Sequence, residues 1–140
     1  MKRFIALSVV CLCLPLVGCD KSPCAKTSGT IMKEGQPVPR VVVTFTPESG
    51  RPGHGVTDEK GQFVITTLKT GDGAFPGWNK VTLAEAPVHS TEPIPSPGAP
   101  GARPPQIKEN PYKAYASTAT TPLQANVQPG TKNHFEFNIE

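Results

Sequence analysis

Apolar and polar residues alternate in several short segments of this chain, and this pattern predicts β-strands. Residues 41–46 are the clearest example, because Val41, Val43 and Phe45 would share one face while the residues between them face the other way. A period of two is that of a strand, whereas a helix needs apolar residues three and four positions apart. The same pattern predicts strands at residues 27–33, 62–68, 78–83, 123–127 and 134–139.

Residues 56–68 predict a β-hairpin in the middle of the chain. A tight turn begins at Asp58 and ends at Gly61, because glycine supplies the positive φ that such a turn needs and aspartate can accept from backbone amides two residues on. In the return arm Phe63 and Ile65 share one face. The other face holds Val64, Thr66 and Leu68.

The strands and the composition together predict the fold class. The chain has 17 prolines and 13 glycines, which suit short strands joined by turns and do not suit long helices. A sandwich of seven antiparallel strands needs about 100 residues. We therefore predict an all-β fold, an antiparallel, immunoglobulin-like β-sandwich of about seven strands in residues 27–140.

Residues 85–111 interrupt this pattern with eight prolines and few apolar residues. Proline lacks the amide that a central strand must donate, so we predict a loop or an extended, polyproline-like arm inserted in the sandwich. Loops of this length are either functional or disordered. Disorder is our leading interpretation, and a functional loop is the alternative.

Residues 1–18 have the pattern of an export signal. Lys2 and Arg3 give a positive start, and residues 4–14 form an apolar run of eleven residues that only Ser8 interrupts. Such a run is too short to cross a bilayer, which takes about 20 residues, but it has the length of a signal-peptide core.

Residues 16–19, Leu-Val-Gly-Cys, resemble the bacterial lipobox. The resemblance implies cleavage between Gly18 and Cys19, acylation of Cys19 by two or three chains, and a short acylated tether at residues 19–26. One acyl chain binds a membrane only marginally, whereas two or three hold it stably. The alternative is an ordinary secretory signal with a chance cysteine at this position.

The residues after the lipobox add two expectations. Asp20, by the sorting rule of enterobacteria, favours retention in the inner membrane over the outer one. Cys11 and Cys13 would leave with the signal and Cys19 would carry lipid, so Cys24 has no partner within the chain. We expect Cys24 to be an inert thiol, and an intermolecular disulfide is the alternative.

Several segments, in their order, resemble the short bacterial lipoproteins with a carboxypeptidase regulatory-like, transthyretin-like domain. The matching segments are residues 28–38, 41–45, 55–63, 71–82, 115–123 and 135–137. The resemblance implies a transthyretin-like β-sandwich that is exported, tethered to a membrane and without assigned catalysis. Asn79 stands where this family usually has tyrosine, and we expect the neighbouring Trp78 to compensate for the missing aromatic side chain.

Charge and motifs exclude several function classes. Without Lys2 and Arg3 the chain has 12 basic and 11 acidic residues, so the near-neutral surface gives no argument for nucleic acid. His89 and Glu92 match the His-x-x-Glu of metallocarboxypeptidases, but they lie in the proline-rich segment without a third ligand. The chain also lacks the Tyr-Arg-Gly-Ser end of transthyretin-related hydroxyisourate hydrolases. We therefore expect no catalytic residues, cofactor or metal.

A few side chains suggest that the protein could bind calcium or a sugar. Asp58, Glu59 and Asp72 lie in turns that could hold calcium, although Asp58 more simply caps its own turn. Trp78 could stack on a sugar ring, although one tryptophan is more often packed on the sandwich. Tyr112 and Tyr115 are expected to close the sandwich rather than to contact a ligand.

The sequence therefore predicts a non-catalytic, lipid-anchored β-sandwich of the cell envelope, facing the periplasm or the cell surface. It would act as a structural or protein-interaction module. Its partners would be the membrane, through the lipid on Cys19, and an unknown envelope protein or glycan. A carbohydrate-binding accessory module that uses Trp78 is the alternative.

Overall fold

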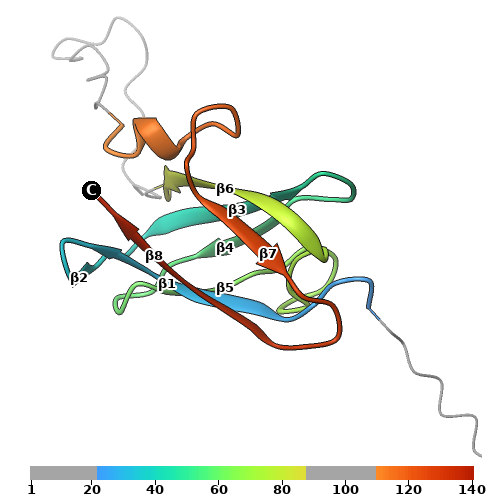
Figure 1. Ribbon diagram of the computed structural model, residues 1–140. Coiled ribbons are helices and arrows are strands. Elements are labelled where there is room, and N and C mark those ends of the chain that lie inside the picture. Colours follow the sequence, from blue (N-terminus) through green and yellow to red (C-terminus); the bar gives the residue numbers. More distant parts are fainter. Residues whose placement is uncertain (1–21, 88–109) are drawn as a thin grey trace, which may run out of the picture.

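The computed structural model describes residues 22–87 and 110–140 (Figure 1). Gly18, Cys19 and Asp20, the His89–Glu92 motif and most of the proline-rich segment lie outside these residues. In the described part of the chain, no helix is long and apolar enough to cross a membrane.

The described chain folds into two β-sheets, which confirms the predicted all-β sandwich (Figure 1). The first sheet holds β1 (Thr27–Lys33), β2 (Gln36–Pro37), β5 (Gln62–Val64) and β8 (Asn133–Ile139). The second has the order β4-β3-β6-β7 and holds β4 (Gly53–Val56), β3 (Val41–Pro47), β6 (Gly77–Glu85) and β7 (Gln124–Val127). A single turn of 3-10 helix, η1 (Lys113–Tyr115), precedes β7.

The predicted turn at Asp58 is present, and the predicted hairpin around it forms only in part. One oxygen of Asp58 accepts from the amides of Lys60 and Gln62, both at 2.9 Å, and Gly61 has a φ of 71°. The arms hydrogen-bond each other at Asp58–Gln62 and again at His54–Thr66. Between these two points, however, β4 pairs with β3 in the second sheet while β5 pairs with β1 in the first. The turn therefore carries the chain from one sheet to the other. Just before the turn, the hydroxyl oxygen of the buried Thr57 accepts a hydrogen bond from the amide of Val41 at 2.8 Å.

The prediction of purely antiparallel pairing is also wrong at one place. β8 runs parallel to β1 along its whole length, from Thr27 opposite Asn133 to Lys33 opposite Ile139. Parallel neighbours need a crossover connection rather than a tight turn, and here nearly the whole domain forms that connection. The other paired strands are antiparallel.

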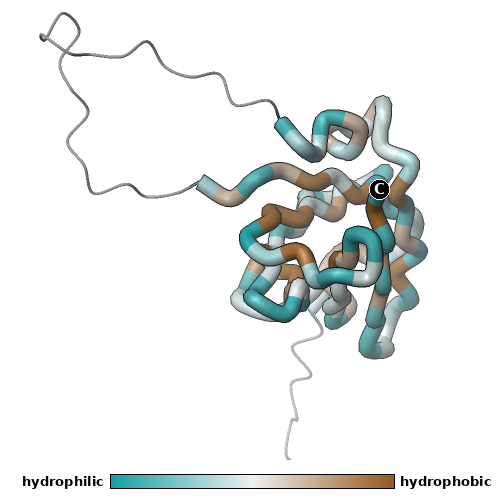
Figure 2. The backbone as a smooth tube through the Cα atoms, turned by 90° about the vertical axis from the view of Figure 1, so that its left-hand side faces the viewer, coloured by the Kyte–Doolittle hydropathy of each residue, from teal (hydrophilic) through white to brown (hydrophobic). Residues whose placement is uncertain are grey.

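The core lies between the sheets and follows the predicted alternation. Val41, Val43 and Phe45 of β3 are fully buried, and Figure 2 shows hydrophobic positions along the strands with hydrophilic residues at the turns. Four aromatic rings bridge the sheets, with centroids 5.8–6.4 Å apart; they belong to Phe45, Phe63, Phe135 and Phe137. Their contact joins β3 of the second sheet to β5 and β8 of the first.

Both ends of the domain are closed by segments outside the sheets. Tyr112 and Tyr115 pack against the core, as expected, and the Tyr115 hydroxyl accepts from the amide of Glu140 at 3.3 Å. At the other end Ala25 is buried and exchanges backbone hydrogen bonds with Ala74 at 2.9 and 3.1 Å. The fold thus begins within the range 19–26 that the sequence assigned to the tether.

Candidate functional site

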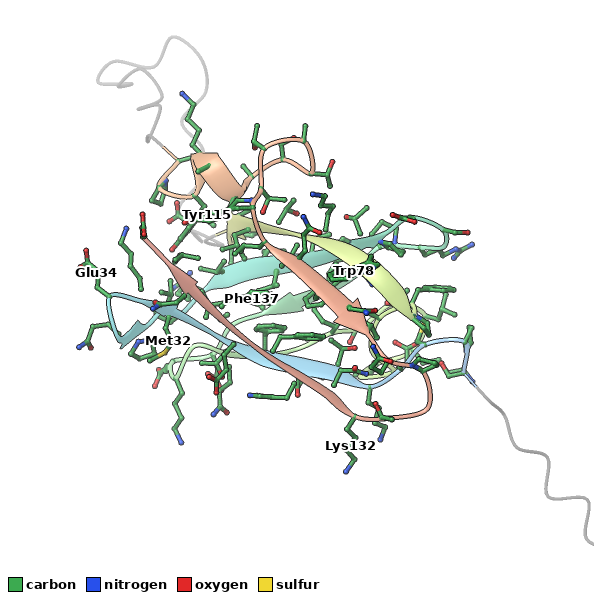
Figure 3. The ribbon with its side chains drawn as sticks, in the orientation of Figure 1. Met32, Glu34, Trp78, Tyr115, Lys132 and Phe137 are labelled. Atoms are coloured by element: carbon green, nitrogen blue, oxygen red, sulfur yellow. The ribbon has the colours of Figure 1, made fainter. Side chains whose placement is uncertain are left out.

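Trp78 is exposed to solvent, which overturns the expectation that it packs on the sandwich. Its side chain is 58% exposed, whereas that of its neighbour Asn79 is 1% exposed. Adjacent residues of a strand face opposite sides of the sheet, so Trp78 could not have filled the space beside Asn79. Figure 3 places Trp78 on β6.

Asn79 has a structural role of its own at the start of β6. Its amide nitrogen donates to the carbonyls of Phe75 at 3.0 Å and Gly77 at 2.9 Å. These bonds hold the turn that leads into the strand. Its Oδ1 is the buried side-chain oxygen without a hydrogen-bond partner among the described residues. The buried Asn79 amide therefore stabilises the backbone turn at the start of β6.

An open groove of about 390 Å³ lies beside Trp78 on the outer face of the second sheet. Its floor is a row of cross-strand neighbours, in which Lys80 of β6 lies opposite Thr46 of β3 on one side and Gln124 of β7 on the other. The groove is lined by Thr46, Pro47, Glu48, Trp78, Asn79, Lys80, Thr118 and Gln124. It thus combines one aromatic face with a hydroxyl, an ammonium and an amide.

The chemistry of this groove suits binding. A tryptophan can cover a flat apolar ligand face, and the neighbouring polar groups can hydrogen-bond its edges. Glu48 is the one carboxylate among the lining residues, so the groove does not offer the paired acid and base of a hydrolase. Sequence reasoning identified Trp78 but missed Thr46, Lys80 and Gln124, because only strand pairing brings them together.

In the turns that suggested calcium, the carboxylates of Asp58 and Asp72 accept hydrogen bonds from backbone amides of the same turns. Asp72 accepts from the amide of Thr67 at 2.8 Å through one oxygen, and from the amides of Leu68 and Lys69 at 3.0 Å through the other. These bonds end β5 earlier than the sequence predicted, because residues 66–72 form a loop around the carboxylate. In residues 22–87 and 110–140, no three His, Cys, Asp or Glu side chains gather as a metal site would require.

The pKa of Asp72 reflects two opposing effects. Burial favours the neutral acid and would raise the pKa, but the backbone hydrogen bonds from Thr67, Lys69 and Leu68 favour the carboxylate and lower it below its ordinary value of 3.8. Folding and ionisation of this side chain are therefore linked.

Asp72→Asn is expected to lower the free energy of unfolding by about 1–2 kcal/mol at pH 7, a value discounted for solvent exposure. Because the folded pKa lies below the unfolded one, this stabilisation is complete above about pH 4 and is lost as the pH falls through the folded pKa. Urea denaturation of both proteins at pH 7 and pH 3 measures the difference. Glu59→Gln, an exposed change in another turn, is the control and should shift stability by less than about 0.5 kcal/mol. An Asp72→Asn deficit that is equally large at both pH values would contradict the prediction.

Cys24 lies beside this loop and is a free, half-buried thiol. Burial and the carboxylate of Asp72 both raise its pKa. Since the thiolate is the reactive form, this environment favours the inert thiol expected from the sequence.

Comparison with protein-family models, with curated proteins and with solved structures found no match for this chain. The resemblance to lipoproteins with a carboxypeptidase regulatory-like domain is therefore a hypothesis that rests on the sequence segments alone.

Proposed function

We propose that this protein is a non-catalytic β-sandwich that a lipid on Cys19 anchors to a membrane of the cell envelope, where it acts as a structural or protein-interaction module. The observation that carries the proposal is the Leu-Val-Gly-Cys sequence at residues 16–19, which follows a basic start and an apolar run. The domain begins close behind it, because Ala25 is already part of the core.

The short tether limits where the domain can act. Ala25 lies six positions after Cys19, and an extended chain spans at most about 3.5 Å per position, or about 20 Å in all. A domain held within this distance remains next to the lipid headgroups. It suits the organisation of neighbouring envelope components better than the capture of distant soluble substrates.

The intact mass of the protein, extracted from the membrane fraction of its own host, tests this proposal. We expect a chain that begins at Cys19 and carries two or three acyl groups, and we expect Cys19→Ser to leave the membrane fraction. Chemical crosslinking in the intact envelope would then identify protein neighbours. A soluble, unacylated natural chain would refute the anchor and make a secreted binding protein the better interpretation.

A specific observation favours glycan binding as a second candidate function. Trp78 stands exposed beside a polar row formed by Thr46, Lys80 and Gln124. A pyranose ring has an apolar face for the indole and hydroxyl groups for such a row. The groove is therefore suited to a sugar unit of an envelope glycan.

Trp78→Ala is expected to weaken glycan binding at least about tenfold, because an exposed aromatic side chain would supply most of the apolar contact. Trp78 is the one tryptophan of the chain, so ligand titration can be followed by its fluorescence in the natural protein and by calorimetry in the variant. Val56→Ala is the matched control, since Val56 is 55% exposed on the same sheet but far from the groove. Full affinity in Trp78→Ala, or no binding across a panel of envelope glycans, would exclude this candidate.

A further inference from the structure

One end of the sandwich is defined by the place where the chain enters it. β1 and β8 both begin there, since Thr27 lies opposite Asn133, and the amide of Asn133 donates to the carbonyl of Lys26 at 2.7 Å. In the second sheet, Val127 lies opposite Gly77 at the same end, and Figure 1 shows the β7–β8 turn beside the start of the described chain. We name this the tether-side end; it comprises residues 22–26, 48–52, 65–76 and 128–132.

Large exposed hydrophobic side chains gather at or next to the tether-side end. Among the described residues they are Val56, Val64, Leu68 and Trp78, and Val56 alone lies at the opposite end. Val64 and Leu68 belong to the end of β5 and the loop that follows it, whereas Trp78 belongs to the groove on the second sheet. Exposed apolar side chains rimmed by polar ones are typical of contact surfaces.

Two lysines lie beside Val64, and a third follows Leu68 along the chain. Lys26 and Lys132 line two shallow hollows of about 470 and 310 Å³, and Val64 lines the smaller one with them. Lys69 follows Leu68 in the loop that Asp72 holds. Figure 3 shows the side chain of Lys132 extending away from the sandwich.

The charges of the two ends differ in sign. The tether-side end has four basic and two acidic residues, a net charge of +2; they are Lys26, Arg51, Lys69, Lys132, Glu48 and Asp72. Among the residues that the structure describes, the opposite end has four basic and five acidic residues, a net charge of −1; they are Lys33, Arg40, Lys60, Lys113, Glu34, Asp58, Glu59, Glu85 and Glu140. At the tether-side end, Asp72 directs its oxygens to backbone amides, and Glu48 lies in the groove on the other sheet.

We propose that the tether-side end docks on the membrane surface, with Lys26, Lys69 and Lys132 on anionic lipid headgroups and Leu68 in the interfacial layer. This inference rests on the proposed acylation of Cys19. An anionic membrane surface is the partner we infer, because the tether-side end is positively charged and because the chain leads from this end to the acylated Cys19. Docking would fix the orientation of the sandwich and turn its opposite end, with Tyr112 and Tyr115, away from the bilayer.

The length of the tether makes this docking physically effective. Ser22 lies three positions after Cys19, so the domain begins within about 10 Å of the acylated residue. That distance is comparable with the Debye length of about 8–10 Å at physiological ionic strength. Each lysine near an anionic surface then favours the docked orientation by about fivefold.

Lysine footprinting of the acylated chain tests the orientation. The protein, purified from host membranes, is placed in phosphatidylcholine vesicles with and without phosphatidylglycerol, labelled with an amine-reactive reagent and read by peptide mass spectrometry. We expect labelling of Lys26, Lys69 and Lys132 to fall at least about fivefold when phosphatidylglycerol is present. Labelling of the lysines at the opposite end should not change; these are Lys33, Lys60 and Lys113.

A matched pair of variants separates charge from burial. In Lys26→Gln/Lys132→Gln, the phosphatidylglycerol-dependent protection of Lys69 should be lost, whereas Lys33→Gln/Lys113→Gln should keep it. All four side chains replaced are exposed, so both variants should fold, which circular dichroism checks. The docking would be overturned if phosphatidylglycerol changed the labelling of both ends equally, or if it protected the lysines of the opposite end.

Flotation with neutral vesicles distinguishes failure of the docking from failure of the anchor. A chain that floats with phosphatidylcholine vesicles but is labelled equally at both ends is anchored without docking, so only this inference falls. A chain that does not float is not lipid-anchored, and both proposals then fall.

Discussion

Phe45→Ala is expected to lower the free energy of unfolding by about 3–5 kcal/mol, the largest loss of any single side-chain truncation in this domain. Phe45 is fully buried, and its ring lies 6.1, 5.8 and 6.3 Å from the rings of Phe63, Phe135 and Phe137. Truncation would leave a cavity between the two sheets and remove the side chain that joins β3 to β5 and β8 of the first sheet. Because a small domain is stable by only about 5–15 kcal/mol, part of the population should unfold at physiological temperature.

Urea denaturation followed by circular dichroism measures this loss. Val64→Ala is the control, because Val64 lies on the strand of Phe63 but is 58% exposed, and it should change stability by less than about 0.5 kcal/mol. A loss below about 1.5 kcal/mol for Phe45→Ala would mean that the sheets can close over the cavity. The aromatic cluster would then not be the main contact between the sheets.

Gly73→Ala is expected to cost at least about 3 kcal/mol and to release the first residues of the domain. Gly73 has a φ of +98°, which costs a residue with a side chain roughly 1–2 kcal/mol. An added methyl group would also overlap the backbone of Ala25, and it would meet the Cα of Lys26 at 2.7 Å. The chain can relieve this overlap only by breaking the hydrogen bonds between Ala25 and Ala74.

Two measurements detect this change. Urea denaturation gives the loss of stability, and brief trypsin treatment of the folded protein should cut after Lys26 faster than in the natural chain. Gly130→Ala is the matched control, since Gly130 has a φ of +72° but no atom within 4 Å of the added carbon, and it should cost only about 1 kcal/mol. Equal losses in the two variants would show that backbone strain alone, without the contact at Ala25, explains the effect.

The middle of the chain shows which features a local sequence pattern can predict and which it cannot. The turn at Asp58 and Gly61 was predictable, because its hydrogen bonds and φ angle depend on neighbouring residues. The partners of its two arms were not predictable from the turn, since β4 pairs with residues 8–14 positions away in β3 and β5 pairs with residues 32–36 positions away in β1. Alternation states which side chains face inward, but it does not state which strand lies alongside.

The candidate site shows the same division. The sequence singled out Trp78 as a possible stacking residue but expected it to be packed on the sandwich. Its alternation with the apolar Val81 and Leu83 already placed it on the other face, yet that face could have been covered by another element. Only the arrangement of β3, β6 and β7 leaves it open and brings Thr46, Lys80 and Gln124 beside it.

The sequence by itself determined most of the longer strands of this protein, their buried faces and the turn at Asp58, because these depend on side-chain alternation and on local hydrogen bonds. It missed the short strands β2 and β4 and made β5 too long. The lipid anchor on Cys19 remains a hypothesis, and it rests on the sequence alone. Only the tertiary structure decided the division of strands between the sheets, the parallel contact of β1 with β8, the groove at Trp78 and the basic tether-side end. Each of these brings together residues distant in the chain, and which of many similar apolar strands pair is settled by the packing of the whole core rather than by any local pattern.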